Sequence, residues 1–139
     1  MLIDVNLNGV FNLVHAVLPV MRAQQEGLII NISSISGRRT ISQLAGTAYC
    51  ASKRALNSLG EAINVEEHEN GIRCTNICPG EVATEILDTR PDPPPIEKRQ
   101  QMLQPEDIGA AALMVACLPP RAHVTELVMT GKTTVLESI

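Results

Sequence analysis

Aromatic residues are nearly missing from this chain of 139 residues, which holds one Tyr, one Phe and no Trp. The sequence is nevertheless 45% apolar, so a core is possible, and Ala, Val, Leu and Ile have to fill it. Side chains of this kind suit closely packed layers of helix on sheet better than an aromatic-rich sandwich. The length predicts a single domain over residues 1–139.

Large basic clusters and long apolar runs are missing as well. The formal net charge is −4, and the basic pair Arg38-Arg39 is predicted to lie in a solvated loop. A nucleic-acid surface needs clustered Lys and Arg, so no nucleic-acid partner is expected. The longest apolar run, residues 110–118, is about half as long as a membrane-spanning helix. We therefore expect no membrane partner and, without a signal-peptide pattern, a cytoplasmic protein.

Motifs for metal binding and for serine hydrolysis are also missing. None of the four cysteines forms a CxxC pair or has a His at ligand spacing, which predicts free thiols in a reducing compartment and no metal site. The three histidines have no carboxylate or Cys partner at such a spacing and are not expected to be catalytic. No GxSxG segment is present, which argues against a serine hydrolase.

The hydrophobic pattern predicts helices that alternate with strands. Apolar residues recur at three- and four-residue steps in the helical segments, and the strands are short apolar runs bounded by Gly or Pro. The expected helices are residues 4–22, 48–70 and 105–118, and the expected strands are residues 28–32, 72–77 and 124–129. This order predicts an α/β fold with a parallel sheet and right-handed crossovers.

Two smaller features complete this reading of the pattern. Residues 83–88 are expected to form a short helix, and the proline-rich segment 89–95 is expected to be irregular. The acidic residues Glu66, Glu67 and Glu69 are predicted to be a solvated helix end.

The single tyrosine lies four residues before a lysine, in the segment YCASK. Residues at this spacing share one face of a helix, so Tyr49 and Lys53 are expected to point the same way. An isolated tyrosine titrates near 10. An ammonium group within about 4–6 Å favours the phenolate and lowers its pKa. The pair would then suit proton transfer between an alcohol and a carbonyl, although the spacing alone is a weak signal.

Other polar residues are predicted at the same edge of the sheet. Ser33-Ser34 follow the strand expected at 28–32, and Pro79-Gly80 follow the strand expected at 72–77. Ligands of open α/β sheets bind at the carboxyl ends of the parallel strands. A hydroxyl, a phenol–ammonium pair and a Pro-Gly loop should therefore converge there.

Four segments, in this order, resemble the short-chain dehydrogenase/reductase family: DVNLNGVF, IINISSISG, YCASK and CPGEVATEI. The resemblance covers nearly the whole chain and implies a doubly wound, Rossmann-type α/β fold. It also implies an oxidoreductase that moves a hydride between NAD or NADP and a small alcohol or carbonyl substrate. In such an enzyme the cofactor carries the hydride and the protein supplies position and proton transfer.

The resemblance assigns a role to each matching residue. Tyr49 would be the general acid/base, and Lys53 would lower its pKa and hydrogen-bond the nicotinamide ribose. Ser34 would hold the substrate oxygen, and Asn6 would help to organise a proton-relay water. Ser36 stands at the family's usual separation from the tyrosine and is the alternative to Ser34, which the strand end favours. The nicotinamide and phosphate side of the cofactor would be lined by Pro79, Gly80, Val82 and Thr84.

The glycine-rich turn of the family, TGxxxGxG, is not found in this sequence. That turn cradles the cofactor pyrophosphate at a helix N-terminus. The chain therefore resembles the C-terminal half of the family's fold, with about three strands, and strand 28–32 is expected to be an exposed edge that invites association. A second hypothesis follows: a catalytically inactive, truncated fragment that acts at most as a binding or oligomerisation module.

Two further expectations come from the resemblance. Dimers of the family pack on the helices that correspond to residues 48–70 and 105–118, which implies a homo-oligomer through these helices. Residues 86–104 lie where the family has its variable substrate loop, and are either a lid or a plain connector.

Overall fold

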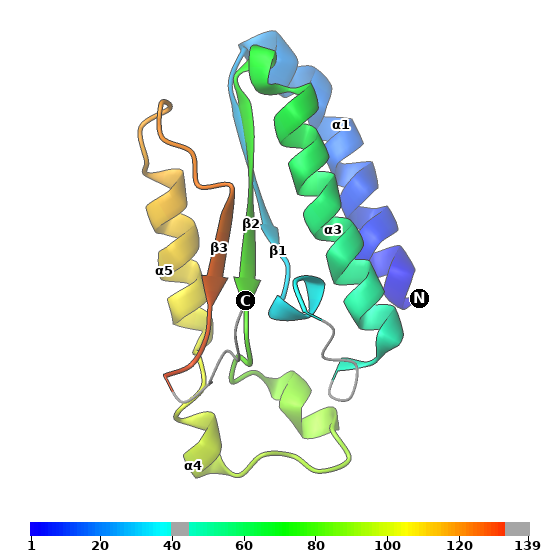
Figure 1. Cartoon of the computed structure of the whole chain (residues 1–139), viewed down its shortest axis with the longest axis vertical. Coiled ribbons are helices and arrows are strands. Elements are labelled where there is room, and N and C mark those ends of the chain that lie inside the picture. Colours follow the sequence, from blue (N-terminus) through cyan, green and yellow to red (C-terminus); the bar gives the residue numbers. More distant parts are fainter. Residues whose placement is uncertain (40–44, 133–139) are drawn as a thin grey trace.

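A computed structural model describes residues 1–39 and 45–132 of the chain (Figure 1). Its sheet has three strands, β1 (Gly27–Ile32), β2 (Ile72–Pro79) and β3 (Glu126–Met129), in the order β1-β2-β3. Both pairings are parallel. The central strand is the most deeply buried of the three. The predicted α/β fold with a parallel sheet is confirmed.

Three longer helices cover this sheet. The helices α1 (Gly9–Gln24) and α3 (Thr47–Glu66) run side by side, and α5 (Pro105–Ala116) lies on the opposite side of the strands (Figure 1). A π-helical turn, Asp4–Asn8, precedes α1. Among the described residues, no helix is long and apolar enough to cross a membrane. The segments predicted as helices are confirmed, with ends that differ by a few residues.

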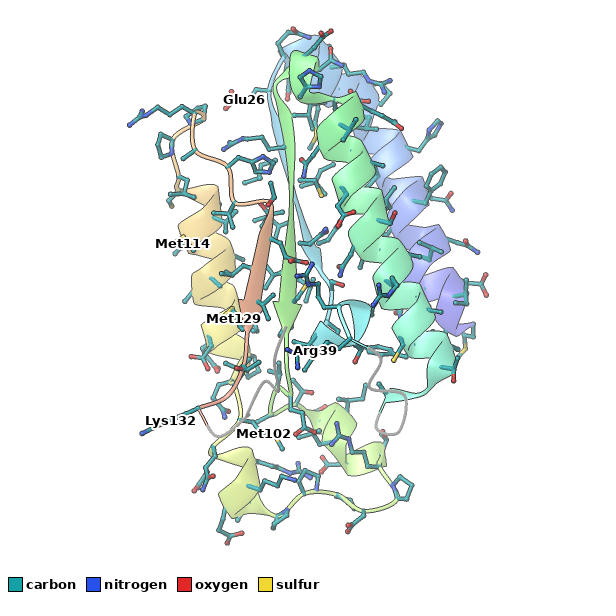
Figure 2. All side chains as sticks on the ribbon, viewed as in Figure 1. Glu26, Arg39, Met102, Met114, Met129 and Lys132 are labelled. Carbon is teal, nitrogen blue, oxygen red and sulfur yellow. The ribbon has the colours of Figure 1, made fainter. Side chains whose placement is uncertain are left out.

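The main core lies between the sheet and the α1/α3 layer. Val14, Ile63, Ile72 and Cys74 are buried together, and partly buried aliphatic side chains from both helices and β1 pack against them. Aliphatic residues fill the space between strands and helices, as the shortage of aromatic residues requires (Figure 2). All four cysteines are free thiols, three of them buried and one, Cys117, exposed.

An ion pair joins the C-terminal ends of α1 and α3. Arg22 Nε donates to Glu67 Oε2 at 2.9 Å, and the guanidinium makes a second bond to Oε1 of the same carboxylate. Asn70 Nδ2 also donates to Glu67, at 2.9 Å. The hydrogen bonds from Arg22 lower the pKa of Glu67 to about 2. The prediction of a wholly solvated acidic end is therefore wrong at Glu67, which turns inward and is buried.

The connection from β2 to α5 contains only short helical turns. The helix expected at 83–88 is a 3-10 turn, Glu85–Thr89, and a single α-helical turn, α4 (Ile96–Arg99), follows the prolines. The hydrogen bonds between residues 81–83 and Leu103 hold the two ends of this segment together. The helix α5 then begins at Pro105, where Gln104 and Asp107 form a capping box.

Candidate functional site

The serine turn follows the carboxyl end of β1. Ser34 caps the 3-10 turn Ile35–Gly37, and its Oγ accepts a hydrogen bond from the backbone N–H of Ser36 at 3.1 Å. Both serines are buried. The turn lies against α3, because a Cβ at Gly37 would come within 2.6 Å of the Lys53 carbonyl oxygen. This close approach requires a glycine and fixes the serines relative to the helix.

Tyr49 and Lys53 project from the first two turns of α3. The Lys53 Nζ atom is 5.8 Å from the centroid of the Tyr49 ring, so the two side chains do share a face of the helix. Lys53 Nζ also donates to the carbonyl oxygen of Ile32, the last residue of β1, at 2.9 Å. Burial lowers the pKa of Lys53. The ammonium is thus held between the phenol and the end of the strand.

Asn6 lies in the π-helical turn before α1, a type of turn that is frequent at functional sites. Its Nδ2 donates to Ser52 Oγ at 3.2 Å, and the Ser52 hydroxyl donates to the carbonyl oxygen of Tyr49 at 2.8 Å. Asn6 and Lys53 both line a groove of about 410 Å³ beside β1. The structure therefore brings Asn6 to the same turns of α3 that carry Tyr49 and Lys53.

Pro79 and Gly80 end β2, as predicted, and Gly80 N donates to Met129 O at 2.7 Å. A Cβ on Gly80 would meet nothing closer than 3.5 Å, so protein packing does not itself require a glycine here. Val82 forms an isolated parallel bridge with Leu103. Thr84 caps the turn Glu85–Thr89 without a capping bond from its side chain, which leaves its hydroxyl without a role in the cap.

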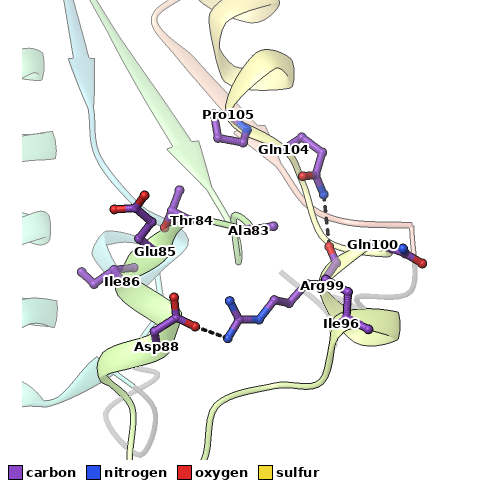
Figure 3. A pocket seen from close by; sticks show the side chains of 10 residues that line it. All are labelled: Ala83, Thr84, Glu85, Ile86, Asp88, Ile96, Arg99, Gln100, Gln104 and Pro105. Carbon is purple, nitrogen blue, oxygen red and sulfur yellow. Dashed lines mark hydrogen bonds and ion pairs between the residues drawn. The ribbon is translucent and has the colours of Figure 1, made fainter.

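Thr84 opens onto a cavity of about 800 Å³ (Figure 3). Its walls come from the turn Glu85–Thr89, from α4 and from the start of α5. Arg99 reaches across from α4 to Asp88, with Nη2 and Oδ1 2.5 Å apart, and the Arg99 Nε atom donates to Pro94 O at 2.9 Å. The segment 86–104 is therefore a wall of this cavity as well as a connection between β2 and α5.

Several contacts between residues far apart in the sequence hold the serine turn in place. No local sequence pattern predicted these contacts. Arg38 Nη1 pairs with Glu126 Oε2 of β3 at 3.0 Å, and Arg54 of α3 donates to Arg38 O at 2.8 Å. Ser33 Oγ donates to Lys53 O at 3.3 Å. The prediction of a solvated loop holds for Arg38, which is exposed although it bridges to the sheet. It is wrong in part for Arg39, which has a buried Nη2 atom at the carboxyl ends of the strands (Figure 2).

Hydroxyl, phenol, ammonium and amide groups thus gather around the carboxyl end of β1 and the start of α3. Parallel strands with such groups at their carboxyl ends are the arrangement of a ligand-binding or catalytic domain of Rossmann type. The model of the family described as short chain dehydrogenase matches residues 1–94, which is more than half of the chain. The chain belongs to this family of oxidoreductases, and its fold is part of the family's Rossmann-type fold.

Curated relatives and solved structures agree with this assignment. An uncharacterized oxidoreductase of Staphylococcus saprophyticus is 37% identical over 127 residues, which are 91% of this chain and 51% of that protein. A serine dehydrogenase complexed with NADP+ matches 99% of this chain and 57% of its own, with 30% identity and a TM-score of 0.83. An alcohol dehydrogenase from the archaeon Thermococcus sibiricus, complexed with 5-hydroxy-NADP, matches 98% of this chain and 55% of its own, with 26% identity and a TM-score of 0.80.

The chain spans about half the length of the curated relatives that it matches. The same holds for the solved structures, whose chains are covered to between 48% and 57%. The prediction of a partial Rossmann-type fold is confirmed.

Proposed function

We propose that the protein is an NAD(P)-dependent oxidoreductase that moves a hydride between the nicotinamide and a small alcohol or carbonyl substrate, with Tyr49 as the general acid/base. The observation that carries the proposal is the position of Lys53 Nζ, 5.8 Å from the centre of the Tyr49 ring and bonded to the end of β1. We assign to this ammonium the role of supporting the Tyr49 phenol during proton transfer, because both groups lie on one face of α3. Tyr49 can then take a proton from an alcohol or give one to a carbonyl oxygen.

Ser34 is the residue that we assign to the substrate oxygen. The backbone N–H of Ser36 donates to Ser34 Oγ and so orients the hydroxyl. This bond does not use the Ser34 O–H group, which can donate to a substrate oxygen. Ser36, the alternative, supplies this orienting N–H group. Asn6 would hold the start of α3 through Ser52 and face the relay water beside Lys53. The Lys53 ammonium has three N–H donors, of which one is used on Ile32 O, so donors are left for a ribose hydroxyl and a water.

The residues after β2 fit the nicotinamide side of the cofactor. Three family members have been solved with NADP+, 5-hydroxy-NADP or NAD. Here Gly80 has room for a close ligand, and the Thr84 hydroxyl faces a large cavity. We assign Pro79, Gly80, Val82 and Thr84 to this side, where the bound cofactor would supply or accept the hydride. The segment 86–104, which walls the same cavity, is assigned to the substrate.

A homo-oligomer is proposed through α3 and α5. Apolar side chains that the monomer leaves exposed are found on both helices: Val65 on α3, and Leu113 and Met114 on α5. Burial of such side chains against a second copy would remove apolar surface from water.

The rival function is a binding or oligomerisation module without catalysis. It is favoured by one observation, the coverage of only about half of each relative. A binding measurement on the chain separates the two functions. Saturable binding of NADH or NADPH, measured by calorimetry, argues for the oxidoreductase. If the chain binds neither cofactor even when it is paired with the uncovered half of a relative, the module is favoured.

Catalysis is tested by Tyr49→Phe, which removes only the phenolic oxygen. The chain, joined to the uncovered half of the Staphylococcus saprophyticus oxidoreductase, should reduce carbonyl compounds with NADH or NADPH. Loss of the acid/base should lower kcat by about 100-fold or more, with little change in cofactor affinity. Lys53→Met should act in the same direction, whereas Lys132→Met, at an exposed position after β3, should have no effect. Equal rates for Tyr49→Phe and the unchanged protein would refute the role of Tyr49.

A further inference from the structure

Arg39 lies directly after the serine turn, the segment that Ser34 caps. Its backbone N–H donates to the carbonyl oxygen of Ile35, in that turn, at 2.8 Å. The turn is itself fixed against α3 by the close approach at Gly37. The backbone of Arg39 is therefore held at a defined place next to Ser34. Figure 2 shows Arg39 at the carboxyl ends of the strands, where ligands of open α/β sheets bind.

The guanidinium group of Arg39 has a buried Nη2 atom that finds no hydrogen-bond partner among the described residues. Arginine carries N–H donors and no acceptor, so an Nη2 atom that is out of water needs an acceptor oxygen. Nor does Arg39 form an ion pair with a carboxylate of residues 1–39 or 45–132. The side chain as a whole is only partly buried, so a ligand can reach it. An anionic oxygen group would satisfy both the charge and the donor.

The neighbouring Arg38 behaves in the opposite way. Its Nη1 atom pairs with Glu126 of β3 at 3.0 Å, and its carbonyl oxygen accepts from Arg54 at 2.8 Å. Three further arginines are each paired with a carboxylate: Arg22, Arg90 and Arg99. Arg38 therefore joins the serine turn to the sheet, whereas the charge of Arg39 is left for a ligand.

The surroundings of Arg39 are basic, although the chain has a net charge of −4. Lys53 donates to the end of β1, and Arg54 donates to the loop that follows the serine turn. Glu126 neutralises one charge of this group, that of Arg38. A local excess of positive charge attracts anions to a binding site. This edge of the sheet therefore favours a ligand of negative charge.

The position of Arg39 in the chain favours the substrate over the cofactor as the source of that charge. The residues assigned to the nicotinamide side follow β2, whereas Arg39 follows β1 and Ser34, to which the substrate oxygen is assigned. We propose that Arg39 binds a carboxylate group of the substrate and so selects acidic carbonyl or hydroxy compounds over neutral ones. The planar fork of its guanidinium matches a carboxylate. This role rests on the proposed function, because it needs the substrate to lie beside Ser34.

Substrates that differ only in charge test the proposal. The chain, joined to the uncovered half of the Staphylococcus saprophyticus oxidoreductase, is assayed with pyruvate, acetoacetate and levulinate, in which the distance from carbonyl to carboxylate grows. Each acid is compared with its methyl ester. We expect the best acid to exceed its own ester in kcat/KM by about tenfold or more, because a hydrogen bond to a charged group is strong. Esters that are reduced as well as every acid would overturn the proposal.

Two variants that remove the same charge at different places assign the preference to Arg39. Arg121 is exposed and precedes β3, so it lies toward the amino ends of the strands. Arg39→Met should lower kcat/KM for the acid by about tenfold or more, mainly through a higher KM, and leave the ester and the KM of the cofactor unchanged. Arg39→Lys should keep part of the preference, and Arg121→Met should keep all of it. An unaltered preference in Arg39→Met, or a change only in the KM of the cofactor, would overturn the proposal.

The stability of the ligand-free protein separates a binding role from a structural one. Because the buried Nη2 atom has no partner in the described chain, Arg39→Met should leave Tm unchanged or raise it. Arg38→Met, which breaks the pair with Glu126, should lower Tm. A loss of Tm in Arg39→Met as large as that in Arg38→Met would contradict the proposal, since it would make Arg39 a support of the turn.

A binding measurement decides the point even if the joined protein reduces no carbonyl compound. Thermal unfolding is followed with rising concentrations of each acid at constant ionic strength, in the presence of NAD+ or NADP+, with which an oxo acid cannot exchange a hydride. At least one acid should raise Tm saturably in the unchanged protein and in Arg121→Met, but not in Arg39→Met, and its ester should not raise it. Failure of turnover alone would refute the proposed function. No saturable rise with any acid, or the same rise in Arg39→Met, would refute the role of Arg39.

Discussion

The two edges of the sheet are built differently. The β3 edge is four residues long, and it includes Glu126, which pairs with Arg38. Short length and charge are the means by which proteins protect an edge strand from further pairing. The β1 edge is six residues long, almost wholly apolar and bordered by a groove. We interpret β3 as an edge that resists pairing and β1 as an edge that requires it.

The largest effect expected from this difference concerns two isoleucines that are register partners. Ile77 in β2 is fully buried, whereas its partner Ile32 in β1 is 47% exposed. Ile77→Ala should lower the free energy of unfolding by about 2–5 kcal/mol, and Ile32→Ala should lower it by less than about 1 kcal/mol. Urea unfolding of both variants measures the difference. If both variants lost the same free energy of unfolding, Ile32 would be as buried as Ile77, and the β1 edge would not be open.

A second pair of variants tests how the serine turn is held. Gly37→Ala places a Cβ 2.6 Å from Lys53 O, and the backbone cannot yield without moving the turn. We expect a loss of about 1–3 kcal/mol. The control Gly109→Ala, in α5, meets no atom within 4 Å and should be stabilising by about 0.4–1 kcal/mol. Thermal unfolding of both proteins decides the point, and a neutral Gly37→Ala would contradict the tight contact between the turn and α3.

A third effect is a dependence of stability on pH that arises away from both edges. The pKa of Glu67 falls from its ordinary value near 4.5 to about 2 because Arg22 hydrogen-bonds its carboxylate. A carboxylate with a lowered pKa stabilises the fold above the unfolded-state pKa, and this stabilisation is lost as the pH falls from about 4.5 toward 2. Unfolding curves at several pH values should show this loss in the unchanged chain and a reduced one in Glu67→Gln.

Glu66→Gln is the control for that series, because Glu66 is exposed and forms no ion pair with Arg22. It should keep the pH dependence of the unchanged chain. A Glu67→Gln variant with an unaltered pH profile would show that the pair with Arg22 does not set the acid stability.

The sequence predicted the elements because each depends on local pattern. The period of the apolar residues placed α1 and α3, and Pro105 with its acidic neighbours placed the start of α5. The strand ends were less predictable, because pairing decides them: β2 continues to Pro79, which is opposite Met129 of β3. Likewise, β3 begins at Glu126 rather than at position 124.

The side-chain contacts that hold the site could be predicted only in part. The spacing of Tyr49 and Lys53 places both on one helix face, as the structure shows. The bond from Lys53 to Ile32, the bridge from Arg38 to Glu126 and the pair of Arg22 with Glu67 all join residues that are far apart in the sequence. No periodicity or short motif records such contacts. They follow from the packing of the helices on the sheet, and that packing also leaves the β1 edge open.

The most direct test of this account is the rate of NADPH- or NADH-dependent carbonyl reduction by the chain alone and by the chain joined to the uncovered half of its relative. We predict turnover only in the joined protein, since Asn6 and Lys53 line a groove that is open in the chain alone. Turnover should be lost again in Tyr49→Phe. Equal turnover by the chain alone would contradict the claim that the open edge must be covered for the site to work.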